Sequence, residues 1–377
     1  MKIAIVSPYI STGENLEYYQ SQQLNLALEL ARLGVTVDIY TARRMKVALD
    51  RYSVNDKVTV YNLPVIAPWT GRTLNQYIMI RQWEQLDKEK YDFIQSSDDC
   101  IFNTFMSALY VLLKGSRLII YQGIYRYSDR KVIRILMKLY DLTAGIVLRR
   151  ACCIAVCKTQ EASRFLQNKG YKRTKVIPVG VNTDIFYPEA RHVNKNLELL
   201  AVGHLVPNKN YSLMIDILQC LTAMVPNVRL TVIGSGPEMN GVLNLVREKR
   251  LLNHFRLIEK VPNREMRLYY SQVDLMLLLS KTEIFGMVIL EAMACGCPVM
   301  ASSIPAAVDV IVDGENGFLL QDLEPLSIAI RIRDIFAESA LIERVRSESI
   351  RAVHERYAWN VIASQYYDLY SKNASKR

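Results

Sequence analysis

The chain has 377 residues, half of them apolar, and 47 Lys and Arg against 37 Asp and Glu give it a net charge of +10. This length predicts two domains, and the seven cysteines, an odd number without a zinc-ligand pattern, favour a reducing compartment over a disulfide framework. No apolar run approaches the roughly 18 to 20 residues that cross a bilayer, so we expect a soluble, cytosolic protein without a signal peptide.

In the first half of the chain, short β-branched runs alternate with segments of helical period, as is typical of parallel sheets with crossover helices. The predicted strands are Lys2–Val6, Val35–Tyr40, Phe93–Gln95, Arg117–Tyr121 and Ile154–Val156. Between the first two, Gln20–Leu33 is predicted to be a helix that Gly34 ends.

The second half repeats the pattern. The predicted strands are Glu198–Val202, Arg229–Ile233, Phe255–Ile258, Leu275–Leu279 and Pro298–Ala301. A polar stretch near residues 180–196 separates the halves, so we predict an α/β protein of two doubly wound, Rossmann-like domains, 1–180 and 181–357. Such domains bind ligands at the carboxyl ends of their strands, so we expect the two to face each other across a cleft.

The positive charge belongs to the first half. Residues 1–180 contain 26 basic and 15 acidic residues, whereas the remainder contains 21 and 22. A basic surface attracts polyanions, so an anionic membrane and a phosphorylated acceptor are both candidate partners. Nucleic acid is not an expected partner, because the sequence contains no nucleic-acid-binding motif beside the charge.

The segment from Ser280 to Ala294 carries the most chemical information. It follows a predicted buried strand and turns into a helix near Gly286, where free amides and the positive end of the helix dipole can bind a diphosphate. Glu291 lies about one turn inside this helix, where a charge needs hydrogen-bonding partners. From the pattern alone, a structural interpretation, with Glu283 as a helix cap and Glu291 as a buried structural acid, is as good as ligand binding by the two residues.

These residues resemble glycosyltransferase family 4, a family of retaining enzymes with the GT-B fold. The likeness consists of two glutamates separated by seven residues, Glu283 and Glu291, with Phe285-Gly286 between them and Ala-Met-Ala-Cys-Gly-Cys-Pro-Val after the second. It continues in the segments 202–210, 232–238 and 313–320 and in the linker 178–186.

The resemblance implies a role for each residue. Glu291 would bind the ribose hydroxyls, Glu283 the donor sugar, and Lys209 the diphosphate leaving group, where charge develops. The other residues expected to bind the donor are Gly234, Ser235 and Gly236, which would let backbone approach the nucleotide, the amides of Ile284, Phe285, Gly286, Met287 and Val288, and also His204, Val261 and Gly13.

The sequence departs from the family at two positions. His204 stands where the family usually has Arg, and the first domain contains no histidine where many members have one near the sugar. Gln122 occupies the corresponding strand end and is expected to hydrogen-bond the sugar without acting as a base. Since the chain has no Asp-x-Asp pair, we expect no metal and no other cofactor.

Two further features of the first domain concern the acceptor. Asp98 and Asp99 follow a strand and are candidates for binding acceptor hydroxyls, with a solvated loop as the alternative. Arg126–Arg150 is predicted to be a basic amphipathic helix that either packs on the core or lies on an anionic membrane. In it Arg130, Arg134 and Lys138 align beside an apolar stripe of Ile133, Leu136, Met137 and Tyr140.

The resemblance therefore implies transfer of a sugar, with retention, from a nucleotide-diphosphate donor to a glycan or lipid-linked acceptor. Polysaccharide, lipopolysaccharide or glycolipid synthesis is the family's commonest setting, in the cytoplasm and at the inner face of the membrane. The C-terminal helix, 358–377, would cross back onto the first domain. The alternatives are a catalytically silent binding or scaffolding subunit, and a nucleotide-sugar epimerase or sugar phosphorylase of the same fold.

Overall fold

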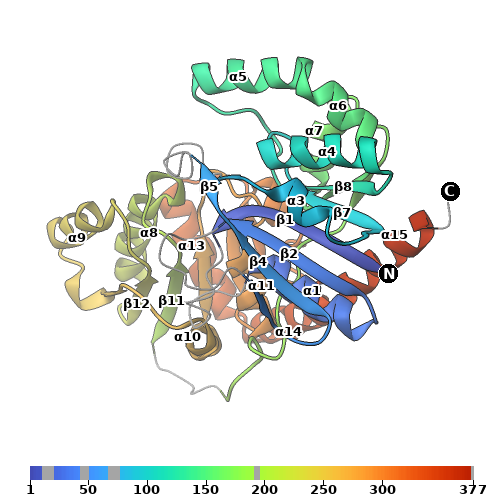
Figure 1. Ribbon diagram of the computed structural model, residues 1–377. Coiled ribbons are helices and arrows are strands. Elements are labelled where there is room, and N and C mark those ends of the chain that lie inside the picture. The colour runs from blue at the N-terminus through green and yellow to red at the C-terminus, as the bar shows by residue number, and fades with distance from the viewer. Residues whose placement is uncertain (11–20, 43–50, 67–76, 191–195, 375–377) are drawn as a thin grey trace. The chain divides into compact units, whose positions relative to one another are not determined.

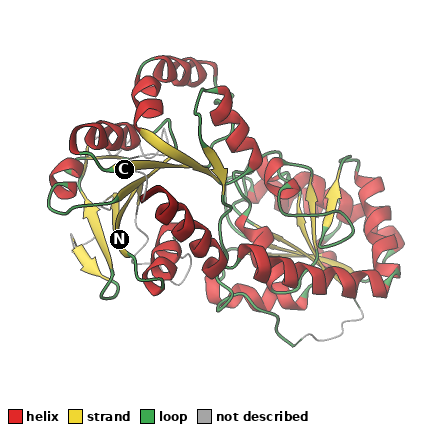
Figure 2. Ribbon diagram, turned by 90° about the vertical axis from the view of Figure 1, so that its right-hand side faces the viewer, coloured by secondary structure: helices red, strands yellow, loops and turns green. Residues whose placement is uncertain are grey.

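A computed structural model describes residues 1–10, 21–42, 51–66, 77–190 and 196–374. The chain divides into two compact units, the first made of residues 1–179 with 359–377 and the second of residues 180–358. Each unit is a sheet with helices on both faces (Figures 1 and 2).

Unit 1 is built on an eight-stranded sheet in the order β10-β9-β8-β7-β1-β2-β4-β3, parallel except for its edge strand β3. Its strands are β1 Lys2–Ile10, β2 Thr36–Ala42, β3 Arg51–Ser53, β4 Val58–Leu63, β7 Phe93–Ser97, β8 Arg117–Gln122, β9 Cys152–Cys157 and β10 Thr174–Val176, with a separate pair β5 Val65–Ile66 and β6 Ile78–Met79. Alternation of apolar strands and crossover helices gives the parallel order, because consecutive parallel strands need a long connection.

Seven helices belong to unit 1 among the residues that the structure describes. They are α1 Gln22–Arg32, α3 Gln82–Leu86, α4 Phe102–Lys114, α5 Lys131–Leu142, α6 Ala144–Ala151, α7 Gln160–Asn168 and α15 Trp359–Ala374. The last of these comes from the far end of the sequence and packs against α1. The Tyr370 hydroxyl donates to Oε1 of Gln95 at 2.7 Å, and Tyr366 and Tyr370 are almost fully buried.

Unit 2 has a six-stranded, all-parallel sheet in the order β13-β12-β11-β14-β15-β16. Its strands are β11 Leu197–Val202, β12 Val228–Ile233, β13 Phe255–Ile258, β14 Leu275–Leu278, β15 Val299–Ser302 and β16 Phe318–Leu320. The order reverses between β11 and β14, and the carboxyl ends of the strands at such a switch point are where doubly wound sheets bind ligands.

The helices of unit 2 cover both faces of this sheet (Figure 2). They are α8 Tyr211–Met224, α9 Met239–Glu248, α10 Met266–Gln272, α11 Met287–Ala294, α12 Pro305–Val308, α13 Pro325–Ala337 and α14 Ser339–Ala352, with 3₁₀ turns at Pro207–Lys209, Leu252–His254 and Asn263–Glu265 and a π-helical turn at Val353–Tyr357. Leucine, isoleucine and valine side chains from β11, β12, β14, α8 and α13 form one apolar core.

The predicted strands are all present, with ends shifted by a few residues, and the helix after β1 is α1. Its N-cap is Ser21, whose side chain accepts from the amide of Leu24, and Gly34 follows it with a φ of 87°, a conformation that favours glycine. None of the described helices is long and apolar enough to cross a membrane.

The single helix predicted over Arg126–Arg150 is wrong. Two helices occupy this range, α5 and α6, and they meet at Thr143, whose φ and ψ of −112° and −84° are not helical. The predicted apolar stripe is also only partly correct, because Ile133, Met137 and Tyr140 are half-buried whereas Leu136 is 58% exposed. The helix period alone could not show that α5 is apolar on two sides.

Candidate donor-binding site in unit 2

Lys209 and Glu283 form an ion pair at the carboxyl ends of the two central strands of unit 2. Lys209 ends the short turn after β11, and Glu283 lies in the loop after β14. The Lys209 ammonium contacts Oε1 of Glu283, which also accepts a hydrogen bond of 2.8 Å from the Ser280 hydroxyl. Both charged side chains are only about 15% exposed, so neither is a freely solvated surface group.

A second pair of contacts joins the two loops that carry this ion pair. The Asn208 amide donates to the carbonyl of Thr282 at 2.7 Å, and the Thr282 hydroxyl donates to Oδ1 of Asn208 at 2.9 Å. Asn208, Ser280 and Thr282 position Lys209 and Glu283, a role that the sequence pattern did not predict. The sequence could have indicated this role, because Asn208 is next to Lys209 and Thr282 is next to Glu283, and neighbours in a strand-end loop help to orient its functional side chains.

The N-terminus of α11 presents free backbone amides beside Glu283. Gly286 precedes the helix with a φ of 70°, and no side chain caps it. The amides of Phe285, Gly286, Met287 and Val288 have no acceptor among the described residues. The interpretation of Glu283 as a cap is therefore wrong, since its carboxylate faces Lys209 and Ser280. Uncapped amides with the helix dipole form a site suited to an anion.

Glu291 lies in the second turn of α11, and among the described residues its one hydrogen-bond donor is the Tyr270 hydroxyl of α10, at 3.0 Å. Burial raises the pKa of Glu291 to about 7, although the hydrogen bond from Tyr270 acts in the opposite direction. With its pKa near 7, Glu291 is readily shifted toward its charged form, because hydrogen bonds that it accepts from further hydroxyls favour the carboxylate.

The raised pKa of Glu291 predicts a pH-dependent stability. Its ordinary value is 4.5, so the stability associated with the protonated group is fully present below that pH and is lost as the pH rises through about 7. We expect Glu291→Gln to raise the melting temperature by a few degrees near pH 8 and to change it little near pH 4.5. Thermal unfolding across this range is the measurement. Parallel curves for the two proteins would contradict the prediction, because they would show that the pKa of Glu291 is the same in the folded and unfolded protein.

Gly234, Ser235 and Gly236 form the turn after β12, and they pack against the loop after β11. A β-carbon on Gly234 would lie 1.9 Å from the carbonyl oxygen of Gly203, and one on Gly236 would lie 2.4 Å from that of Leu205. The amide of Leu205 donates to the carbonyl of Ser235 at 2.9 Å. The glycines are thus required by the packing of the chain against itself, which is a different reason from the predicted approach to a nucleotide.

The remaining predicted donor residues have varied positions. Ile284 and His204 are exposed, Phe285 is buried, and Val261, in the loop after β13, is half-buried. His204 is two residues beyond β11, close in sequence to Lys209. Gly13 lies outside the described residues.

Gln122 and the two aspartates of unit 1 are occupied by contacts within that unit. Gln122 is fully buried; its amide nitrogen donates to the carbonyl of Ile124 at 2.8 Å, and its oxygen accepts from the amide of Asp99 at 2.9 Å. Asp98 accepts from the amides of Gly123 and Ile124, and Asp99 pairs with Lys169. The solvated-loop alternative is wrong, and this arrangement makes Gln122 a residue that shapes the loop after β8 rather than one that faces a sugar.

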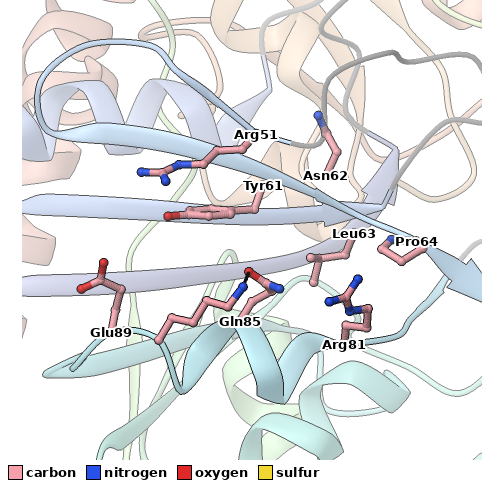
Figure 3. Close-up of a pocket in the computed structure, with 9 residues that line it drawn as sticks. Arg51, Tyr61, Asn62, Leu63, Pro64, Arg81, Gln85 and Glu89 are labelled. Carbon is pink, nitrogen blue, oxygen red and sulfur yellow. Dashed lines mark hydrogen bonds between the residues drawn. The ribbon is translucent and has the colours of Figure 1, made fainter.

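A cavity of about 400 Å³ lies elsewhere in unit 1, beside β3, β4 and α3 (Figure 3). The Arg51 guanidinium lies over the ring of Tyr61, 5.2 Å from its centroid, and Arg81 pairs with Glu84. None of the residues predicted to bind the donor or the acceptor lines this cavity. The described residues also contain no group of three or more His, Cys, Asp or Glu side chains that could hold a metal ion.

Comparison with known proteins agrees with this architecture. Residues 184–351 match the model of the glycosyl transferases group 1, and residues 19–181 match that of the glycosyl transferase 4-like domain. An uncharacterized glycosyltransferase of Haemophilus influenzae is 23% identical over 335 residues, which cover 86% of this chain and 90% of that protein.

Solved structures share the fold at lower identity. Sucrose-phosphate synthase from Thermosynechococcus elongatus superimposes with a TM-score of 0.77 at 20% identity, covering 100% of both chains. The Anabaena protein HepE, solved in complex with UDP, gives 0.75 at 17% identity, covering 99% of this chain and 100% of that one. With the two family models matching nearly the whole sequence, the chain belongs to the family-4-like glycosyltransferases of the GT-B fold.

Proposed function

We propose that the protein transfers a sugar, with retention of its anomeric configuration, from a nucleotide-diphosphate donor to a glycan or lipid-linked acceptor. Unit 2 binds the donor and unit 1 the acceptor, in the cytoplasm and at the inner face of the membrane, during polysaccharide, lipopolysaccharide or glycolipid synthesis. The observation that carries the proposal is the placement of Lys209 and Glu283 beside the uncapped N-terminus of α11. The UDP bound to HepE, which has the same fold, supports a nucleotide donor.

Each group in this site has a chemical task in such a transfer. The amides at the start of α11 and the Lys209 ammonium hold the diphosphate, and Lys209 neutralises the charge that develops as the phosphate leaves. Both contacts that Glu283 makes among the described residues use Oε1, which leaves Oε2 to accept a hydrogen bond from a sugar hydroxyl. Glu291 accepts from the ribose hydroxyls. The departing phosphate takes the acceptor proton, so Gln122 need not act as a base.

The alternatives differ in what the chain does with a bound donor. A screen of nucleotide sugars by thermal shift identifies donors, because binding to the folded state raises its melting temperature. We expect one or a few donors to shift it and then to lose their sugar to an acceptor or to water. An altered sugar still attached to the nucleotide would indicate an epimerase. A melting shift without any turnover would indicate a silent binding subunit.

A further inference from the structure

The outer face of α5 and the start of α6 is an apolar surface exposed to solvent. We define this outer face by the side chains of Val132, Ile135, Leu136, Leu139, Leu142 and Ile146, which are between 49% and 71% exposed. The five members in α5 follow a helical spacing (132, 135, 136, 139 and 142), so they lie along one side of that helix, and Ile146 is the exposed apolar residue at the start of α6. An exposed apolar patch of this continuity marks an interaction surface in a folded protein.

The outer face is distinct from the side of α5 that packs on the protein. Ile133, Met137 and Tyr140 are half-buried, and the Tyr140 hydroxyl points to the carbonyl of Ile101 at 3.4 Å. Helix α5 packs against α6, and α6 packs in turn against α4. In Figure 1, α5 is accordingly the helix of this group farthest from the sheet. These inner contacts hold α5 in place without the outer face.

Exposed basic side chains flank the outer face. Lys131, Arg134 and Lys138 lie on the side of the helix between the outer and inner faces, Arg130 precedes the helix as its N-cap, and all four are exposed. From Arg130 to Ala151 the only acidic residue is Asp141, which is buried and paired with Lys169. The surface therefore combines apolar and positively charged groups, and the exposed carboxylate that precedes it, Asp129, pairs with Arg126 at 2.8 Å.

We propose that the outer face of α5, with its basic flank, lies in the interfacial region of an anionic membrane. An amphipathic helix parallel to a bilayer buries its apolar side at the boundary of the acyl chains, while lysine and arginine side chains reach the headgroups. A protein partner would need an acidic surface around an apolar groove, whereas an anionic bilayer offers both properties over any area. The proposal does not depend on the assigned donor chemistry, because no predicted donor residue belongs to this face.

Co-sedimentation of the full chain with lipid vesicles tests the proposal. We expect binding to phosphatidylcholine vesicles that contain phosphatidylglycerol, little binding to phosphatidylcholine alone, and weaker binding as the salt concentration rises. The apolar triple variant Val132→Ser, Leu139→Ser, Leu142→Ser and the charge triple variant Arg130→Ser, Arg134→Ser, Lys138→Ser should each lower the partition coefficient by about tenfold or more.

A matched control removes three exposed leucines of unit 2 by the triple variant Leu252→Ser, Leu268→Ser, Leu326→Ser, which should bind like the unaltered protein. Thermal unfolding verifies that all variants are folded. In addition, a Leu139→Trp variant should shift its emission to shorter wavelength with anionic vesicles only. Equal binding of the apolar triple variant and the unaltered protein would overturn the proposal. So would a dimer in solution that the apolar triple variant dissociates, which would make this face an interface between two copies.

Discussion

Replacing Lys209 with glutamine is expected to lower kcat for sugar transfer by about 100- to 1000-fold, the usual cost of removing one group that stabilises developing charge. The structure places this ammonium against Glu283, mostly out of solvent, where a charge acts more strongly than in water. Glutamine is one atom shorter than lysine, but it keeps a polar end without the charge, and the backbone turn of Pro207–Lys209 needs no change. Steady-state kinetics with the donor identified by the screen are the measurement.

The control for this variant is Arg256→Gln, which removes one positive charge from an exposed side chain on β13. It should leave kcat within about twofold, because a screened surface charge acts weakly at a distance. If Lys209→Gln instead raises KM with kcat unchanged, Lys209 binds the donor equally well before and during the reaction. A loss of folding would assign the lysine to stability through its pair with Glu283.

Replacing Gly234 with alanine is expected to lower the free energy of unfolding by roughly 3 to 5 kcal/mol or to prevent folding. The added β-carbon would meet the Gly203 carbonyl oxygen at 1.9 Å, which is backbone and cannot rotate away. Gly234 also has a φ of 150°, which side chains rarely adopt. Denaturant unfolding gives the free-energy difference.

Gly241→Ala is the matched control, because it is the same substitution in the same unit. Gly241 lies within α9, and an added β-carbon there would have no atom within 4 Å. Alanine at an unobstructed helix position should raise stability by about 0.5 to 1 kcal/mol. Similar stabilities of the two alanine variants would show that the loops after β11 and β12 separate easily.

The fold could be predicted from the sequence because most of the parallel strands are short apolar runs separated by helical segments, although β4, β10 and β16 were not predicted. Lys209, Glu283 and Glu291 were identified by their resemblance to a family, and the structure gives their neighbours. The sequence pattern could not show which residues distant in sequence would contact these three side chains or their loops. Asn208 meets Thr282 across 74 residues, and such pairings depend on strand order rather than on local preference.

The first domain was harder to interpret for the same reason. Gln122 stands at a strand end, where a ligand contact is expected, but backbone groups of the loops after β7 and β8 hydrogen-bond to its side-chain amide. In α5, the helical period correctly indicated an amphipathic segment. It could not indicate which apolar side faces the protein, because that depends on where α6 and α4 lie.

The placement of α15 has a consequence for how the protein is made. Residues 180–358 form one continuous stretch, so the core of unit 2 needs no segment from another part of the chain. Unit 1 begins first, yet Tyr366 and Tyr370 fill part of its interior, and the second of these bonds to Gln95 across 275 residues. During synthesis, the first 179 residues therefore leave one flank of their sheet uncovered until α15 has emerged from the ribosome.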